Sequence, residues 1–241
     1  MFKEYFALKA LNRETPGKSW FRIEAKAGDE SSVYIYDEIG YYGITADAFI
    51  RELNSITAKK INLHLNTPGG SVFDGVAIYN AAIKHPATVH THIDGLAASM
   101  GSIIALAGEK VFMASNAMFM MHNPWSIVIG DAATMRKEAD LLDKISSSSL
   151  IKTYTDKSGK DEKEIKDLMD AETWMGAEEA KAAGFIDEIT GKNEAAAKVS
   201  FDLSCFAKVP VALKEKPAEE PKEIIVTQNV RRKRLELVEL N

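Results

Sequence analysis

The sequence has almost none of the residues that cross-link small secreted domains or build structural metal sites. Cys205 is the one cysteine among 241 residues, so the chain cannot form an internal disulfide and has no cysteine cluster for a zinc ion. An excess of positive charge is also missing, because the formal net charge is −5, and we expect no nucleic-acid partner. These absences favour a protein of a reducing compartment, and we expect it in the cytoplasm.

Long hydrophobic runs are absent as well. The longest weakly polar run, Gly95–Gly108, lies between Asp94 and Glu109 and is shorter than the roughly 20 apolar residues of a membrane-spanning helix. Met1–Glu14 mixes charged and apolar residues and lacks the continuous apolar core of a signal peptide. We therefore expect no membrane association and interpret Gly95–Gly108 as a helix buried in a globular core.

What the chain does contain is the composition of a globular protein, with 46% hydrophobic and 27% charged residues. The hydrophobic pattern predicts strands at Ser32–Tyr36, Ile61–Asn66, Val89–Asp94, Lys110–Met113 and Met118–Met121. It predicts helices at Thr45–Leu53, Val72–Lys84, Ser99–Ala107, Ala132–Tyr154, Asp161–Met169 and Glu178–Ala183. The first 30 residues read as polar and irregular. Alternating strands and helices indicate an α/β fold with helices on a largely parallel sheet.

The composition changes after Gly191. The remaining residues contain no glycine, three of the seven prolines and clustered charges. We predict a folded domain over residues 1–191 and a charged, proline-containing tail over 192–241. The basic run Arg231–Arg234 is interpreted as part of a solvated end rather than as a nucleic-acid site.

One stretch of small residues, Gly95–Ser102, follows a predicted strand and leads into a predicted helix. Ser99 would lie on the turn between them, with its hydroxyl at the edge of the sheet and the first amides of the helix beside it. Small neighbours at such a turn are what a nucleophile elbow requires. Close packing of a helix would explain the same residues, so this stretch alone leaves both readings open.

A serine nucleophile needs a base. The candidate bases are the five histidines, His64, His85, His90, His92 and His122. His90 and His92 share one face of a strand and could ligate a metal, but no third ligand accompanies them, and a polar strand face is favoured. His122 follows the apolar strand Met118–Met121 and precedes Asn123-Pro124, which ends the strand. Its imidazole is therefore expected at the sheet edge where the elbow would lie.

A carboxylate to orient the base and amides to stabilise an oxyanion complete such a site. Asp170 and Glu172 lie between two predicted helices. The resulting order of serine, histidine and acid differs from that of the α/β-hydrolases, chymotrypsin and subtilisin. The turn Thr67–Gly70 ends an earlier strand, and its glycines leave backbone N–H groups accessible.

Residues 61–189 resemble the Clp-type serine peptidases. The motifs that carry the resemblance are Asn66-Thr67-Pro68-Gly69-Gly70, Gly95-Leu96-Ala97-Ala98-Ser99-Met100-Gly101, Met121-His122-Asn123-Pro124, Gly176-Ala177-Glu178-Glu179-Ala180 and Gly184-Phe185-Ile186-Asp187. The resemblance implies a ClpP/crotonase-type spiral of β-β-α units, in which the long helix from Ala132 protrudes as a handle. It also implies assembly into homo-oligomeric rings that act on peptide or protein substrates.

The same resemblance implies a role for each motif. Ser99 would be the nucleophile, His122 the general base, and the amides of Gly70 and Met100 the oxyanion hole. Glu172 falls at the family's acid position, which is usually Asp, and Asp170 is kept in reserve as the acid. The implied acyl-enzyme mechanism uses no metal and no organic cofactor.

Two departures from the housekeeping protease indicate a particular branch. Glu172-Thr173-Trp174, together with the charged tail, is similar to the phage and prophage head maturation proteases, which implies capsid or scaffold substrates and a bacterial or phage-infected cytoplasm. Trp125–Gly130 replaces the glycine-rich start of the handle, so a single heptamer-like ring is favoured over stacked rings. The need for an AAA+ unfoldase stays open. The alternatives are a catalytically weak assembly protein and an acyl-CoA enzyme of the crotonase fold.

Overall fold

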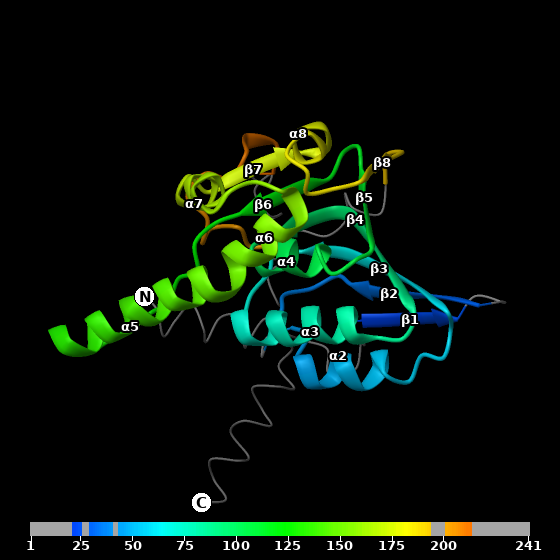
Figure 1. Cartoon of the computed structure of the whole chain (residues 1–241), viewed down its shortest axis with the longest axis horizontal. Helices are drawn as coiled ribbons and strands as arrows, with labels where there is room; N and C mark the ends of the chain where they lie inside the picture. The colour runs from blue at the N-terminus through cyan, green and yellow to red at the C-terminus, as the bar shows by residue number, and fades with distance from the viewer. Residues whose placement is uncertain (1–20, 26–28, 41–42, 194–200, 214–241) are drawn as a thin grey trace, which may run out of the picture. The chain divides into compact units, whose positions relative to one another are not determined.

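The structure is a computed structural model that describes residues 21–25, 29–40, 43–193 and 201–213 (Figure 1). The chain divides into two compact units, residues 1–209 and 210–241. In the second unit the described residues include a short 3₁₀ turn, Val211–Leu213. The division at Gly191 expected from composition stays a prediction.

The first unit contains one mixed sheet. Its strands are β1 (Phe21–Ala25), β2 (Glu30–Ile35), β3 (Lys60–Thr67), β4 (Thr88–Ala98), β5 (Lys110–Ala114), β6 (Met118–Met121), β7 (Thr173–Gly176) and β8 (Glu188–Thr190). The order is β1-β2-β3-β4-β5-β8, while β6 pairs with both β4 and β7. The pairs β1–β2 and β6–β7 are antiparallel and the other pairs are parallel. The predicted α/β fold with a largely parallel sheet is confirmed.

The helices connect and cover these strands. They are α2 (Ala46–Leu53), α3 (Val72–Lys84), α4 (Met100–Ala105), α5 (Ala132–Ile145), α6 (Ile151–Ser158), α7 (Glu162–Asp170) and α8 (Ala177–Ala182). Helix α3 packs on α2 and α4, and α7 and α8 contact β7. Helix α5 buries none of its residues, and Figure 1 shows it extending away from the sheet. No helix among the described residues is both long and apolar enough to span a bilayer.

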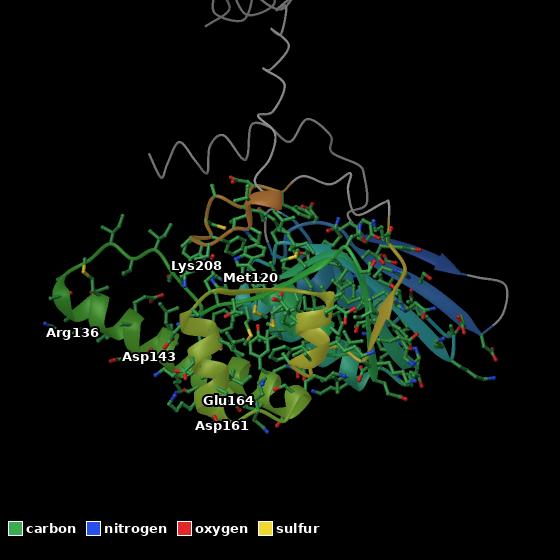
Figure 2. All side chains as sticks on the ribbon, turned by 90° about the horizontal axis from the view of Figure 1, so that it is seen from above. Met120, Arg136, Asp143, Asp161, Glu164 and Lys208 are labelled. Atoms are coloured by element: carbon green, nitrogen blue, oxygen red, sulfur yellow. The ribbon has the colours of Figure 1, made fainter. Side chains whose placement is uncertain are left out.

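Local sequence accounts for most of these elements. In β3 the alternate residues Ile61, Leu63 and Leu65 are fully buried, as a strand with one face on the core requires. Helix α7 begins with a capping box between Asp161 and Glu164, both labelled in Figure 2. In this motif each side chain accepts a hydrogen bond from the other residue's backbone N–H, which satisfies donors that the helix leaves free.

The structure corrects several predicted boundaries. Strand β1 lies where an irregular segment was predicted, and β7 and β8 were missed because they are too short to show a period. The run Gly95–Gly108 is not one helix, because its first residues extend β4 to Ala98 by pairing with β6. Small residues fit a strand and a turn equally well, and only the partner strand decides between them. The predicted helix from Ala132 runs on to Ser158 through a π-helical turn at Ser146–Leu150.

Candidate active site

Ser99 lies between the end of β4 and the start of α4, in an unusual backbone conformation. Its φ of 53° and ψ of −123° lie outside the regions that residues with a side chain readily adopt. Its N–H donates to the carbonyl of Met120 on β6 at 3.0 Å. The predicted turn is therefore a strained strand-to-helix corner that turns the serine out of both elements, which is the geometry of a nucleophile elbow.

The buried hydroxyl groups of Ser102 and Tyr154 stabilise this backbone conformation. Ser102 Oγ donates to the carbonyl of Ser99 at 2.6 Å and lies 2.6 Å from the hydroxyl of Tyr154 on α6. The Ser102 hydroxyl donates its one proton to the Ser99 carbonyl. The Tyr154 hydroxyl is therefore the donor in the hydrogen bond with Ser102 Oγ. Burial raises the pKa of Tyr154 well above its ordinary value, so this donor stays protonated. Sequence reasoning missed Tyr154, and nothing in its local pattern marks it.

His122 lies directly beside Ser99, as the sequence predicted. Parallel pairing places Ala98, the last residue of β4, opposite Met120, the last but one residue of β6, so Ser99 and His122 follow their strands at the same edge of the sheet. His122 Nε2 is 2.8 Å from Ser99 Oγ, which is hydrogen-bond distance. Burial lowers the pKa of His122 below its usual 6.5, and the negative charge of Glu172 opposes this in part. The imidazole is therefore neutral near pH 7 and able to accept a proton.

The glycine turn after β3 packs directly against the elbow. Gly69 has a φ of +90°, and a Cβ added there would lie 2.8 Å from Met100 N and 2.6 Å from the Ala98 carbonyl. Only glycine permits this approach. The amides of Gly70 and Met100 donate to no acceptor in the part of the chain that the structure describes. Both N–H groups are therefore available to an oxyanion next to Ser99.

The two candidate acids have other partners in this structure. The Glu172 carboxylate accepts hydrogen bonds from Trp174 Nε1 at 3.2 Å and from the backbone amides of Ala207 and Lys208. Asp170 Oδ1 accepts from Asn123 Nδ2 at 2.7 Å. Within the described residues neither carboxylate is hydrogen-bonded to His122. Glu172 acts on His122 through the electrostatic effect of its negative charge and not through a hydrogen bond. The identity of the acid therefore stays a prediction.

The other strand histidines form a separate layer on the sheet. The rings of Tyr34, His64, His92 and Phe112 stack at centroid distances of 4.6, 4.7 and 4.8 Å across neighbouring strands. His64 Nδ1 is 2.9 Å from Asp94 Oδ2. Burial lowers the pKa of His92 to about 4. No group of three histidine, cysteine or acidic side chains suited to a metal ion occurs within the residues described here.

Comparison with known proteins identifies the family to which this fold and this Ser–His pair belong. The family model described as Clp protease matches residues 15–193, so the chain belongs to the Clp protease family. It is 39% identical over 146 residues to the ATP-dependent Clp protease proteolytic subunit of Streptococcus gordonii, covering 57% of this chain and 71% of that protein. The corresponding subunit of Streptococcus equi subsp. equi is 40% identical over 147 residues, covering 57% and 72%.

A solved structure confirms the fold. A ClpP1 mutant from Listeria monocytogenes superposes with a TM-score of 0.60 and 27% identity, covering 69% of this chain and 94% of that one. The expected ClpP-type α/β fold is thereby confirmed.

Proposed function

We propose that this protein is a serine endopeptidase that cleaves peptide bonds through an acyl-enzyme. One observation carries the proposal: Ser99 Oγ lies 2.8 Å from His122 Nε2 on a strained elbow against which a glycine turn is packed. Membership of the Clp protease family supports the same chemistry. The Ser–His contact also favours an enzyme over a catalytically weak assembly protein.

The mechanism uses the groups already described. His122 takes the proton of Ser99 as Oγ attacks the peptide carbonyl, and the N–H groups of Gly70 and Met100 stabilise the oxyanion. His122 then protonates the leaving amine, and water hydrolyses the acyl-enzyme with His122 again acting as base. The charge of Glu172 favours the imidazolium that forms on His122 during both steps.

A fluorophosphonate probe and a peptide substrate test this proposal together. We expect the probe to label the wild-type chain at Ser99 and to leave Ser99→Ala unlabelled. Peptide cleavage should fall by about 10³- to 10⁶-fold in Ser99→Ala and in His122→Ala, and the double variant should be no worse than either single one, because the pair acts as a unit. Absence of labelling in folded wild-type protein would count against the peptidase.

We further propose that the substrates are phage capsid or scaffold proteins and that the chain works as a homo-oligomeric ring. Glu172-Thr173-Trp174 at the acid position and the charged C-terminal residues support the head maturation branch. Cleavage of a purified scaffold protein at discrete sites, compared with an unrelated unfolded protein such as casein, tests the substrate. Equal degradation of both proteins would favour a general peptidase.

A further inference from the structure

The side of the catalytic pair that carries Glu172 and Trp174 is covered by a segment of this chain, Leu203–Val209. Phe206 packs edge-on against two rings, with centroid distances of 5.3 Å to His122 and 5.7 Å to Trp174. Phe206 and Val209 retain only 8% and 9% exposure. Figure 2 shows the segment in orange, with Lys208 labelled.

The polar contacts of the segment are those of a bound peptide. Glu172 Oε2 accepts from the Ala207 amide at 2.8 Å, and Glu172 Oε1 accepts from the Lys208 amide at 2.5 Å. The Lys208 ammonium donates to the carbonyl of Ala171. One carboxylate thus binds two successive backbone N–H groups at a bend of the chain, and these two contacts use backbone atoms rather than a particular side chain.

Glu172 is suited to this role by its backbone and its charge. Its φ of 48° is in the left-handed region, which is unusual for a residue with a side chain. Burial acts to raise the pKa of Glu172, but the hydrogen bonds from Lys208, Ala207 and Trp174 outweigh it, so the pKa lies below its ordinary value. The Glu172 carboxylate is therefore ionised, and its oxygens accept hydrogen bonds from the segment.

The hydrogen bonds between Glu172 and the segment also affect His122. While both Glu172 oxygens accept from Ala207 and Lys208, the carboxylate is not hydrogen-bonded to the imidazole, and Phe206 covers one side of the ring. A histidine base without an oriented acid loses most of its efficiency, because the tautomer and the imidazolium are no longer stabilised.

We propose that His122, Glu172 and Trp174 form a peptide-binding surface whose ligand is an aromatic-Xaa-Lys segment, here Phe206-Ala207-Lys208 of the same chain, and that its occupation holds the peptidase in a blocked state. The blocking rests on the proposed function, whereas the binding itself does not. Displacement of the segment by a partner, or its removal by proteolysis, frees Glu172 to pair with His122.

Matched variants separate the contacts. Phe206→Ala removes the ring that packs on His122, and Phe201→Ala removes an aromatic side chain nearby in the sequence as its control. Lys208→Pro removes the backbone donor to Glu172, whereas Lys208→Ala keeps that N–H and removes only the ammonium contact. Circular dichroism and thermal melting establish that each variant is folded.

Two measurements on the full chain then test the proposal. Hydrogen exchange at single-residue resolution should show slow exchange of the Ala207 and Lys208 amides, which is lost in Phe206→Ala and in Glu172→Gln. The rate of fluorophosphonate labelling at Ser99 should rise about tenfold in Lys208→Pro, since one hydrogen bond to a charged group is of that size. It should also rise in Phe206→Ala, because the ring that packs on His122 is lost. It should be unchanged in Phe201→Ala. Adding a synthetic peptide of residues 203–209 should slow labelling of Phe206→Ala again, and a scrambled peptide should not.

The outcomes distinguish this inference from the proposed function. Equal or slower labelling in Phe206→Ala and Lys208→Pro overturns the blocked state, because the segment would then support the site rather than cover it. Fast exchange of both amides in the wild type overturns the binding surface. Slow exchange with peptide binding, but no labelling in any variant, contradicts the serine peptidase and supports the peptide-binding surface.

Discussion

At the scale of single residues, the environment of His122 decides how the proposed base behaves. Burial lowers its pKa, and the carboxylate of Glu172 raises it again in part. A base must be neutral to accept the proton of Ser99, so activity is present above the His122 pKa and is lost as the pH falls through it. The lowered pKa therefore keeps the proposed enzyme active in mildly acidic solution.

The pH profile of kcat/KM for a peptide substrate should show this directly. We expect the acidic limb of the wild-type profile to have its midpoint below 6.5, the ordinary value for histidine. Glu172→Gln removes the negative charge that favours the imidazolium, so its midpoint should lie lower still and its kcat should fall. Asp170→Asn, whose carboxylate is paired with Asn123, should have the smaller effect. The reverse order would identify Asp170 as the acid.

At the scale of elements, the site depends on how tightly the turn after β3 meets the start of α4. Gly69 lies so close to Ala98, Ser99 and Met100 that any Cβ would overlap backbone atoms of this corner. Gly101 approaches Thr67 in the same way, since a Cβ there would lie 2.6 Å from Thr67 Cγ2. The glycines are thus needed where two elements touch, and they position the amides as well as the fold.

Gly69→Ala tests this packing. The substitution combines a positive φ with a backbone overlap, and we expect it to lower the free energy of unfolding by about 1–3 kcal/mol and to reduce labelling at Ser99. Gly191→Ala is the matched control, because an added Cβ there meets nothing within 4 Å. Chemical denaturation of both variants measures the difference. Equal stability of the two variants would show that the turn adjusts to the added Cβ without losing free energy of unfolding.

At the scale of the whole molecule, the region from Trp125 to the end of α5 presents apolar side chains to solvent. Trp125 and Leu141 are 57% and 43% exposed, and Ile129 is 94% exposed. Helix α5 has no fully buried residue, although Ile145 at its end packs against the core, and Met135 and Leu141 on it are exposed. Exposed apolar residues gathered in one region of the chain are typical of a surface buried between subunits.

Sedimentation velocity measures whether this surface joins subunits. We expect the wild type to sediment as an oligomer, and Ile129→Asp combined with Leu141→Asp to shift it to smaller species, since two charges would then be buried in the interface. Lys137→Ala, a change on the same helix that adds no charge, should leave the distribution unchanged. A monomeric wild type, or an unaltered double variant, would contradict the assembly.

Part of the site could be predicted because its signals are local. Ser99 and His122 each stand at the end of an apolar strand, and parallel strands that pair end at the same edge, so their proximity follows from the topology. The turn at Gly69 and Gly70 could be predicted for a similar reason, because glycine readily adopts the positive φ angles found there. Ser102 and Tyr154 could not be paired in this way, because they are 52 residues apart and meet only through the packing of α6.

The sequence by itself determined the α/β class and indicated Ser99, His122 and the glycine turn as the candidate site, since hydrophobic period and turn chemistry act over a few neighbours. Only the tertiary structure decided the partners of each polar group. Glu172 accepts from Ala207 and Lys208, which lie 35 and 36 residues further along the chain. A hydrogen bond depends on distances of a few tenths of an ångström, and these arise only when the whole chain has packed.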